Sequence, residues 1–279
     1  MKLKHQLVAC LSIASIALMA CNNNTDKTET ETTTAKEIKM KEDNVSYTSD
    51  SVTMNGYVVY DENKEGPRPA VLVVPEWWGL NDYVKGRAKQ LADLGYIAMA
   101  VDMYGNGKTV DNPEDAGKMA TPFYQNPQMA KARFDAALAK LKSYAQADQS
   151  KIAAIGYCFG GAQVLNMARM GSDLKGVVSF HGNLVGVAPD KNLLKADVLV
   201  CHGAADPFVP QSDVDKFKKQ MDSIGAKYTF KAYEGATHAF TNPNATAVGE
   251  KFKIPIAYNA AADSASWNDM KSFFSNIFK

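Results

Sequence analysis

A cysteine flanked by glycines is the feature of this 279-residue sequence that points most directly to chemistry. Gly156, Cys158 and Gly160 form the pattern Gly-x-Cys-x-Gly, between an apolar run typical of a strand and a run typical of a helix. In that setting the pattern indicates a nucleophile elbow, a tight turn that exposes a reactive side chain above a sheet. A helix N-terminus beneath Cys158 favours negative charge at that position. The alternative is an ordinary tight turn in which the cysteine only packs.

A nucleophile of this kind needs a base, and the base needs an acid that orients it. Asp206 and His238 supply these residue types, and each follows a predicted strand. The order nucleophile, acid, histidine is the order found in α/β-hydrolases. Each residue has an ordinary alternative, because Asp206 could cap a turn before Pro207 and His238 could be an idle loop histidine. The three together, in this order, favour a catalytic triad.

Two further histidines follow predicted strands but precede the base. His181 is a candidate for the pocket lining, and His202 is interpreted as a structural residue of the acid loop. The four histidines of the chain show no metal-ligand spacing, so neither a metal nor an organic cofactor is expected.

The elements that must position these residues alternate along the chain, which predicts a mostly parallel sheet flanked by helices on both faces. Ligands in such sheets bind at the carboxyl ends of the strands. A β-hairpin region is predicted over residues 52–59, and strands over 70–75, 96–101, 151–157, 177–180, 198–201 and 228–233. Helices are predicted over 81–94, 126–147, 160–170, 212–224 with Ser212 as cap, and a C-terminal segment that contains Trp267, Met270, Phe274 and Ile277.

Composition favours a single folded domain. The chain is 46% hydrophobic and has a formal net charge of +1, so it can bury a large core and creates no strong field for nucleic acid or an anionic membrane surface. Only Cys158 and Cys201 lie in the predicted domain, and a small buried hydrophobe is the ordinary role of a cysteine in an apolar strand such as that of Cys201. A disulfide between the two is therefore not favoured.

The first 44 residues differ from the rest. Two lysines and an apolar run over residues 7–20 predict a signal peptide over residues 1–20. Ala20 directly before Cys21 resembles a bacterial lipoprotein signal, which implies diacylation of Cys21 and a lipid anchor at the bacterial cell envelope; an ordinary signal peptide is the alternative. Residues 21–44 are polar and predict a disordered tether, so the folded domain is expected over 45–279.

Five segments, in order along the predicted domain, together resemble the dienelactone hydrolase family. The resemblance implies an α/β-hydrolase fold and a Cys-Asp-His triad formed by Cys158, Asp206 and His238. It also implies that Glu76 contacts the resting nucleophile, and that the backbone N–H groups of Phe159 and Trp77 form the oxyanion hole. The segments are Pro75-Glu76-Trp77-Trp78-Gly79, Val101-Asp102-Met103-Tyr104, Gly156-Tyr157-Cys158-Phe159-Gly160-Gly161, Asp206-Pro207-Phe208-Val209-Pro210 and His238-Ala239-Phe240.

The sequence departs from this family where two arginines hold the substrate carboxylate. Asn106 stands at the place of one arginine, and residues 211–214 contain no arginine at the place of the other. An uncharged or differently charged ester therefore fits better than a carboxylated dienelactone. Aromatic side chains are the candidates for an apolar pocket, with some of them expected in the core: Trp77, Trp78, Tyr83, Tyr104, Phe159 and Phe208.

The sequence thus predicts a hydrolase that cleaves a small carboxylic ester or lactone through a thioester acyl-enzyme. Two alternatives stay open, a non-catalytic lipoprotein that binds a ligand in the cleft and a thiol-dependent acyltransferase. Membrane contact is expected only through the lipid anchor, nucleic acid is not expected as a partner, and the oligomeric state is left open.

Overall fold

A twisted sheet positions the candidate residues. The computed structural model describes residues 37–279, and the predicted signal peptide, Cys21 and most of the predicted tether lie outside them. Eight strands occur in the described part: β1 (Met40–Ser49), β2 (Val52–Asp61), β3 (Arg68–Val74), β4 (Ile97–Ala100), β5 (Ala147–Tyr157), β6 (Gly176–Phe180), β7 (Asp197–Gly203) and β8 (Tyr228–Tyr233).

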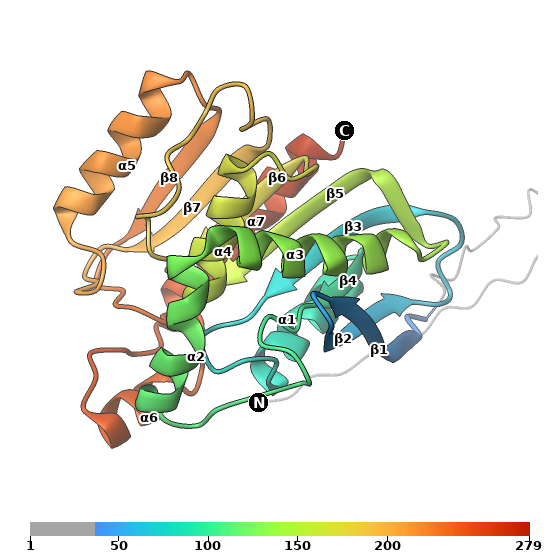
Figure 1. Ribbon diagram of the computed structural model, residues 1–279, viewed down its shortest axis with the longest axis horizontal. Coiled ribbons are helices and arrows are strands. Elements are labelled where there is room, and N and C mark those ends of the chain that lie inside the picture. Colours follow the sequence, from blue (N-terminus) through green and yellow to red (C-terminus); the bar gives the residue numbers. More distant parts are fainter. Residues whose placement is uncertain (1–36) are drawn as a thin grey trace, which may run out of the picture. The chain divides into compact units, whose positions relative to one another are not determined.

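The strands are hydrogen-bonded in the order β1-β2-β4-β3-β5-β6-β7-β8 (Figure 1). β1 pairs antiparallel with β2, β2 pairs antiparallel with β4, and the other neighbours are parallel. The parallel strands β3, β6 and β7 and the second half of β5, from Ile152, are almost fully buried, as expected for strands with helices on both faces. The predicted fold class, a mostly parallel α/β-hydrolase sheet, is confirmed.

Helices cover the two faces unequally. The described residues form α1 (Asp82–Asp93), α2 (Pro113–Gln125), α3 (Pro127–Lys142), α4 (Phe159–Arg169), α5 (Gln211–Ser223), α6 (Ala245–Phe252) and α7 (Ala260–Ile277). Side chains of α2, α3, α4 and α5 pack in one core, and those of α1 and α7 pack in a second core on the other face. In Figure 1, α3, α4 and α5 lie in front of the sheet. None of these helices combines the length and apolar character of a membrane-spanning segment.

The register of the central strands brings two chain segments together. β3 and β5 pair with Val74 opposite Gly156, so the chain that leaves β3 at Glu76 and Trp77 emerges beside Cys158. The carboxyl ends of β7 and β8 lead into the segments that carry Asp206 and His238. The sheet therefore brings the candidate residues to one edge, the carboxyl edge at which open α/β sheets bind ligands.

Three predicted boundaries are wrong. The tether was expected to extend to Asn44, but β1 begins at Met40 and pairs with β2 over its whole length; its outward-facing charged residues make the composition resemble that of a linker. The helix predicted over 126–147 ends at Lys142, and β5 already begins at Ala147. Ser212 lies inside α5, whose N-cap is Pro210 with no side-chain cap bond.

Candidate active site

Cys158 occupies a strained turn between β5 and α4. Its backbone has φ 52° and ψ −114°, in the left-handed half of conformational space that a residue with a side chain rarely adopts. The flanking glycines make the turn possible, because a Cβ on Gly156 would overlap the carbonyl oxygen of Gly160, and a Cβ on Gly160 would overlap that of Val74. This geometry holds the Cys158 side chain out above the sheet, at the N-terminus of α4.

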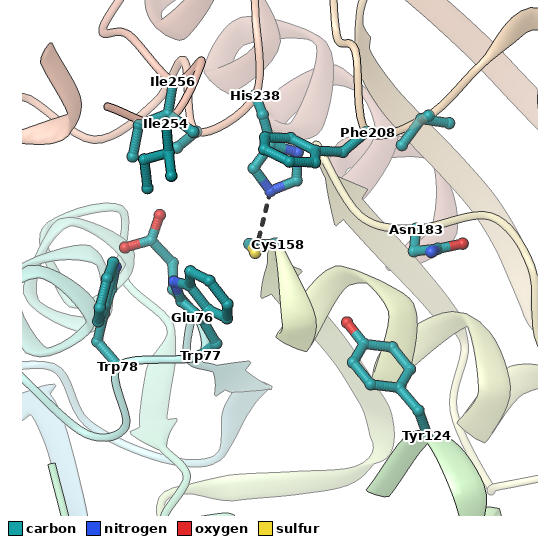
Figure 2. A pocket seen from close by; sticks show the side chains of 12 residues that line it. Glu76, Trp77, Trp78, Tyr124, Cys158, Asn183, Phe208, His238, Ile254 and Ile256 are labelled. Atoms are coloured by element: carbon teal, nitrogen blue, oxygen red, sulfur yellow. Dashed lines mark hydrogen bonds between the residues drawn. The ribbon is translucent and has the colours of Figure 1, made fainter. Parts of the chain in front are cut away.

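The structure brings Cys158, His238 and Asp206 into one hydrogen-bonded row. His238 Nε2 lies 3.0 Å from Cys158 Sγ, and His238 Nδ1 lies 2.8 Å from Asp206 Oδ2 (Figure 2 shows the first of these contacts). Asp206 Oδ1 accepts from the N–H of Phe208, which fixes the carboxylate. The row has the connections that a nucleophile, a base and an orienting acid require.

The environment of His238 favours its protonated form. Burial alone lowers the pKa of the imidazole, but the acidic neighbours Cys158 and Asp206 outweigh burial and raise it to about 10. An imidazole with these two neighbours can hold the proton that it later gives to a leaving group.

Glu76 lies in the pocket wall but bonds a different partner from the one expected. Its Oε2 accepts from Nδ2 of Asn242 at 2.7 Å, whereas Cys158 Sγ pairs with His238. The expected contact between Glu76 and the resting nucleophile is therefore absent from the described residues. Burial raises the pKa of Glu76 to about 7, although the Asn242 bond and the charge of His238 act in the opposite direction.

His181 does not line the pocket, which corrects its prediction as a lining residue. It is completely buried behind the nucleophile. Its Nδ1 accepts from the main-chain N–H of Cys158 at 3.1 Å, and its Nε2 lies 2.7 Å from Thr241 Oγ1. The Thr241 hydroxyl in turn lies 2.7 Å from the hydroxyl of Tyr83. Burial, together with the charges of His238 and Arg87, lowers the pKa of His181 well below its usual range.

The prediction that Tyr104 lines the pocket is also wrong. It is buried outside the pocket lining, and its hydroxyl donates to the carbonyl oxygen of Trp77 at 2.8 Å. This bond orients the turn that carries the Trp77 N–H. Neither that N–H nor the N–H of Phe159 has a hydrogen-bond acceptor within residues 37–279, so both are available for a ligand. The ring of Phe159 is buried in the core rather than in the pocket wall.

A cavity of about 210 Å³ opens beside Cys158 and His238 (Figure 2). Trp77, Trp78 and Phe208 line it, and Tyr83 does not. No lysine or arginine of the described part contributes to its wall, which agrees with the missing arginines of the sequence. The lining residues are Glu76, Trp77, Trp78, Tyr124, Cys158, Asn183, Phe208, Val209, His238, Ala239, Ile254 and Ile256.

The capping segment, residues 241–259, supplies two of these side chains. It contains α6 and returns to the strand end, where the N–H of Ala257 donates to the carbonyl oxygen of His238 at 3.3 Å and that of Asn259 donates to Phe240 at 3.0 Å. Ile254 and Ile256 thereby form an apolar wall opposite the nucleophile. Arg87 ties the start of the segment to the domain through the carbonyl oxygen of Thr241 and through Asp263.

Sequence reasoning missed six pocket residues. Val209 and Ala239 lie inside the family-like segments without a role assigned to them, and four others lie outside those segments: Tyr124, Asn183, Ile254 and Ile256. Asn183 follows a strand that was predicted correctly, so its position was a usable signal. The other three lie on α2 and in the capping segment, which the motifs of the sequence did not predict. Within the described part, no group of three or more His, Cys, Asp or Glu residues could hold a metal ion. Cys158 and Cys201 are both free.

An α/β-hydrolase is defined by three features that this chain has: the order of strands in the sheet, the elbow after β5, and an acid and a histidine after β7 and β8. Residues 54–278 match the model of the dienelactone hydrolase family, and the chain belongs to that family. Membership makes it a hydrolase of carboxylic esters.

Three of the known proteins that are similar to the chain match between 63% and 85% of it. Protein usf of Aquifex pyrophilus is 30% identical over 82% of this chain and 96% of its own length. A protein of Methylorubrum extorquens provisionally named carboxymethylenebutenolidase is 32% identical over 63% of this chain and 64% of its own. Among solved structures, a dienelactone hydrolase-like promiscuous phosphotriesterase from metagenomic libraries has a TM-score of 0.81 and 38% identity, over 85% of this chain and 98% of its own.

Proposed function

We propose that the protein hydrolyses an uncharged carboxylic ester or lactone through a thioester formed on Cys158. One observation carries the proposal: the Sγ–Nε2 distance of 3.0 Å and the Nδ1–Oδ2 distance of 2.8 Å connect Cys158, His238 and Asp206 at the edge of an apolar cavity. This arrangement suits nucleophilic catalysis with a base held by an acid.

In the proposed reaction Cys158 Sγ attacks the ester carbonyl carbon, and the thiol proton resides on His238. The N–H groups of Phe159 and Trp77 bind the oxyanion of the tetrahedral intermediate. His238 then gives the proton to the leaving alcohol and the thioester forms. A water molecule, which loses its proton to His238, attacks the thioester and releases the acid and the free thiol. Asp206 keeps the imidazole oriented throughout.

The charge of the pocket supports an uncharged substrate. Desolvating a carboxylate is costly unless a cation or several donors bind it, and the wall formed by the described residues contains no lysine or arginine. At pH values above the Glu76 pKa of about 7, the Glu76 carboxylate would also repel a substrate carboxylate beside it. We therefore propose that a carboxylated dienelactone, the substrate that a relative's provisional name suggests, is disfavoured.

Hydrolysis of 4-nitrophenyl esters tests the proposal, with Cys158→Ala as the control. We expect turnover by the natural enzyme, none by Cys158→Ala, and an acyl adduct on Cys158 in rapidly quenched samples by mass spectrometry. Absence of both ester turnover and iodoacetamide labelling of Cys158 would favour the non-catalytic ligand-binding alternative. Formation of new esters when alcohols are added would favour the acyltransferase alternative.

A second substrate class can be tested with the same variants, because one similar solved protein is a promiscuous phosphotriesterase. We propose that a neutral phosphotriester also enters this pocket, whose lining within residues 37–279 contains no lysine or arginine. Release of 4-nitrophenol from paraoxon by the natural enzyme, and not by Cys158→Ala, would support this side activity; equal rates with the two would contradict it.

We also propose that the protein is exported and lipid-anchored at Cys21. The proposal depends on the apolar run over residues 7–20, the Ala20-Cys21 junction and the polar residues that follow.

A further inference from the structure

The nucleophile divides the pocket into two unlike ends. In Figure 2, Trp77, Trp78 and the two isoleucines lie on one side of Cys158, and Tyr124 and Asn183 lie on the other. The first end is lined by indole rings and aliphatic side chains around Glu76. The second end presents a phenol and an amide, both neutral, and neither is needed for the proposed reaction steps.

Tyr124 directs a free hydroxyl into the second end. It lies near the end of α2, and its ring packs edge-on against Phe159 with the centroids 5.6 Å apart. The hydroxyl points toward Cys158 in Figure 2 and has no hydrogen-bond partner within residues 37–279; the residue is 41% exposed, so a bound substrate would be what removes the hydroxyl from water. Partial burial and the neighbouring Cys158 raise the pKa of the phenol, so Tyr124 keeps its proton and acts as a donor.

Asn183 supplies a second donor whose orientation is fixed. It follows β6, and its Oδ1 accepts from the N–H of Val185 at 2.8 Å. Because the oxygen is occupied by a main-chain donor, the amide nitrogen is the atom left for a ligand. In the described part of the chain that nitrogen donates to no acceptor, and in Figure 2 the amide oxygen points away from Cys158.

We propose that Tyr124 and Asn183 form a donor subsite, which binds a second carbonyl oxygen of the substrate a few bonds from the scissile ester. This inference rests on the proposed function and specifies its substrate as a keto ester or a diester rather than a simple alkyl ester. A hydrocarbon chain at this end would leave two donors desolvated without an acceptor, whereas a carbonyl oxygen satisfies them. Neutral donors suit a neutral acceptor. This agrees with the pocket wall, which contains no lysine or arginine of residues 37–279.

Matched esters test the subsite and decide which half of the substrate it holds. One pair differs in the acyl group, methyl 4-oxopentanoate against methyl pentanoate, and the other in the alcohol, 4-oxopentyl acetate against pentyl acetate. Selectivity is the ratio of kcat/KM for ketone over methylene, measured by pH-stat titration. The intrinsic reactivity of each ester is the same whichever enzyme variant hydrolyses it. The change in selectivity from one variant to another therefore reports the subsite alone.

Tyr124→Phe retains the ring against Phe159, and Asn183→Asp retains the acceptor for Val185 while removing the donor. We expect each to lower the ketone selectivity of one pair about 3- to 10-fold, the effect of one lost hydrogen bond. Tyr96→Phe removes a hydroxyl from a ring packed on Phe274, outside the pocket lining, and serves as the control with unchanged selectivity. A change in selectivity of less than about twofold is smaller than the effect of one hydrogen bond. Changes that small in both variants and for both pairs would overturn the subsite but leave the proposed function intact.

A binding measurement separates the two proposals if no ester is hydrolysed. Calorimetric titration of Cys158→Ala with the two members of each ester pair needs no turnover. We expect the ketone of one pair to bind Cys158→Ala more tightly than its methylene counterpart, and the preference to disappear when Tyr124→Phe is added. Equal affinities within both pairs in both backgrounds would overturn the subsite, whatever the outcome of the activity assay.

Discussion

The main-chain N–H of Cys158 donates to Nδ1 of His181 at 3.1 Å, although His181 takes no place in the triad. An Nδ1 that accepts must carry no proton, so the proton of the neutral ring is on Nε2, where Thr241 is the partner. The lowered pKa of His181 agrees with this assignment. The same N–H also donates to the carbonyl oxygen of Phe180 at 3.0 Å, so a buried histidine and a strand carbonyl together hold the main chain of the elbow from behind.

Two substitutions of His181 separate the role of its acceptor from that of its bulk. Asparagine places an oxygen near the position of Nδ1, whereas glutamine reaches the position of Nε2 and leaves the Cys158 N–H without this acceptor. We expect His181→Gln to lower kcat/KM about 10- to 100-fold, the cost of a small misplacement of the nucleophile, and His181→Asn to restore most of it. Equal losses in the two variants, measured on 4-nitrophenyl acetate, would show that His181 only fills space.

Glu76 makes stability depend on pH. Its pKa is raised from the ordinary 4.5 to about 7, so the folded protein keeps a proton that the unfolded chain releases. The contribution of Glu76 to the free energy of unfolding therefore falls as pH rises from about 4.5 to 7, by roughly 3 kcal/mol at full effect, and levels off above that. His238, whose pKa is raised from 6.5 to about 10, adds a fall above pH 6.5 that Glu76→Gln shares with the natural protein. Urea unfolding at pH 5 and pH 8 measures the sum. Glu76→Gln, which retains an acceptor for Asn242, should show a smaller change between the two pH values; an identical change in both proteins would contradict the assignment.

Asp206→Asn should lower ester hydrolysis by about 10²- to 10⁴-fold, because the imidazole loses the acid that selects its tautomer. Stopped-flow or steady-state assays with 4-nitrophenyl acetate give kcat/KM. Asp213→Asn changes a half-buried carboxylate in the first turn of α5, outside the pocket lining; it is the matched control and should retain natural activity. If the two variants behave alike, Asp206 does not orient His238.

The buried pair of Arg87 and Asp263 should be a major contributor to stability. Arg87 Nη2 lies 2.6 Å from Asp263 Oδ1, and the two side chains are 7% and 15% exposed. Arg87→Met leaves a partly buried carboxylate without its partner and should lower the free energy of unfolding by about 3–5 kcal/mol. Lys118→Met removes an exposed pair with Glu114 of the same length and should cost less than about 1 kcal/mol. Guanidinium unfolding curves of the two variants give the comparison.

Cys21 is predicted to carry the lipid anchor. Cys21→Ser should move the protein from the detergent-extracted membrane fraction to the soluble fraction of expressing bacteria, whereas Cys10→Ser, inside the predicted signal peptide, should not. Mass spectrometry of the membrane form should give the mass of a chain that starts at a diacylated Cys21. An unmodified chain in the membrane fraction would contradict the proposal.

The sequence was sufficient to predict the parts of the site that obey local rules. The elbow around Cys158 needs glycines at fixed spacing, and buried parallel strands read as apolar runs, so the order of strands and the positions of Asp206 and His238 followed. Side-chain partners were harder to predict. His181 and Tyr104 both follow strands at the correct edge, yet their rings turn inward to bond the main chain of Cys158 and Trp77. Only the three-dimensional packing decides between those orientations.

Elements with weak patterns were missed for a related reason. α6 is eight residues long and ends at Lys253 in a left-handed conformation, with neither a side-chain N-cap bond nor a long apolar stripe. α2 contains Pro122, which argues against a helix when read locally. Asn112 and Pro113 at the start of α2 were a usable signal, but the packing of its Phe123 on Tyr104 and Phe159 was not. Ile254 and Ile256, which follow α6, had no signal in the sequence.

The capping segment is closed at its base by the bonds of Ala257 to His238 and of Asn259 to Phe240, and this closure has an evolutionary consequence. The segment leaves and rejoins the domain at nearly the same point, so its length and composition can change while the histidine stays registered to the last strand. Loops with close ends tolerate insertion and replacement. Descendants of such a gene can thus acquire new substrates by exchanging this segment as a module, with the reaction chemistry inherited unchanged.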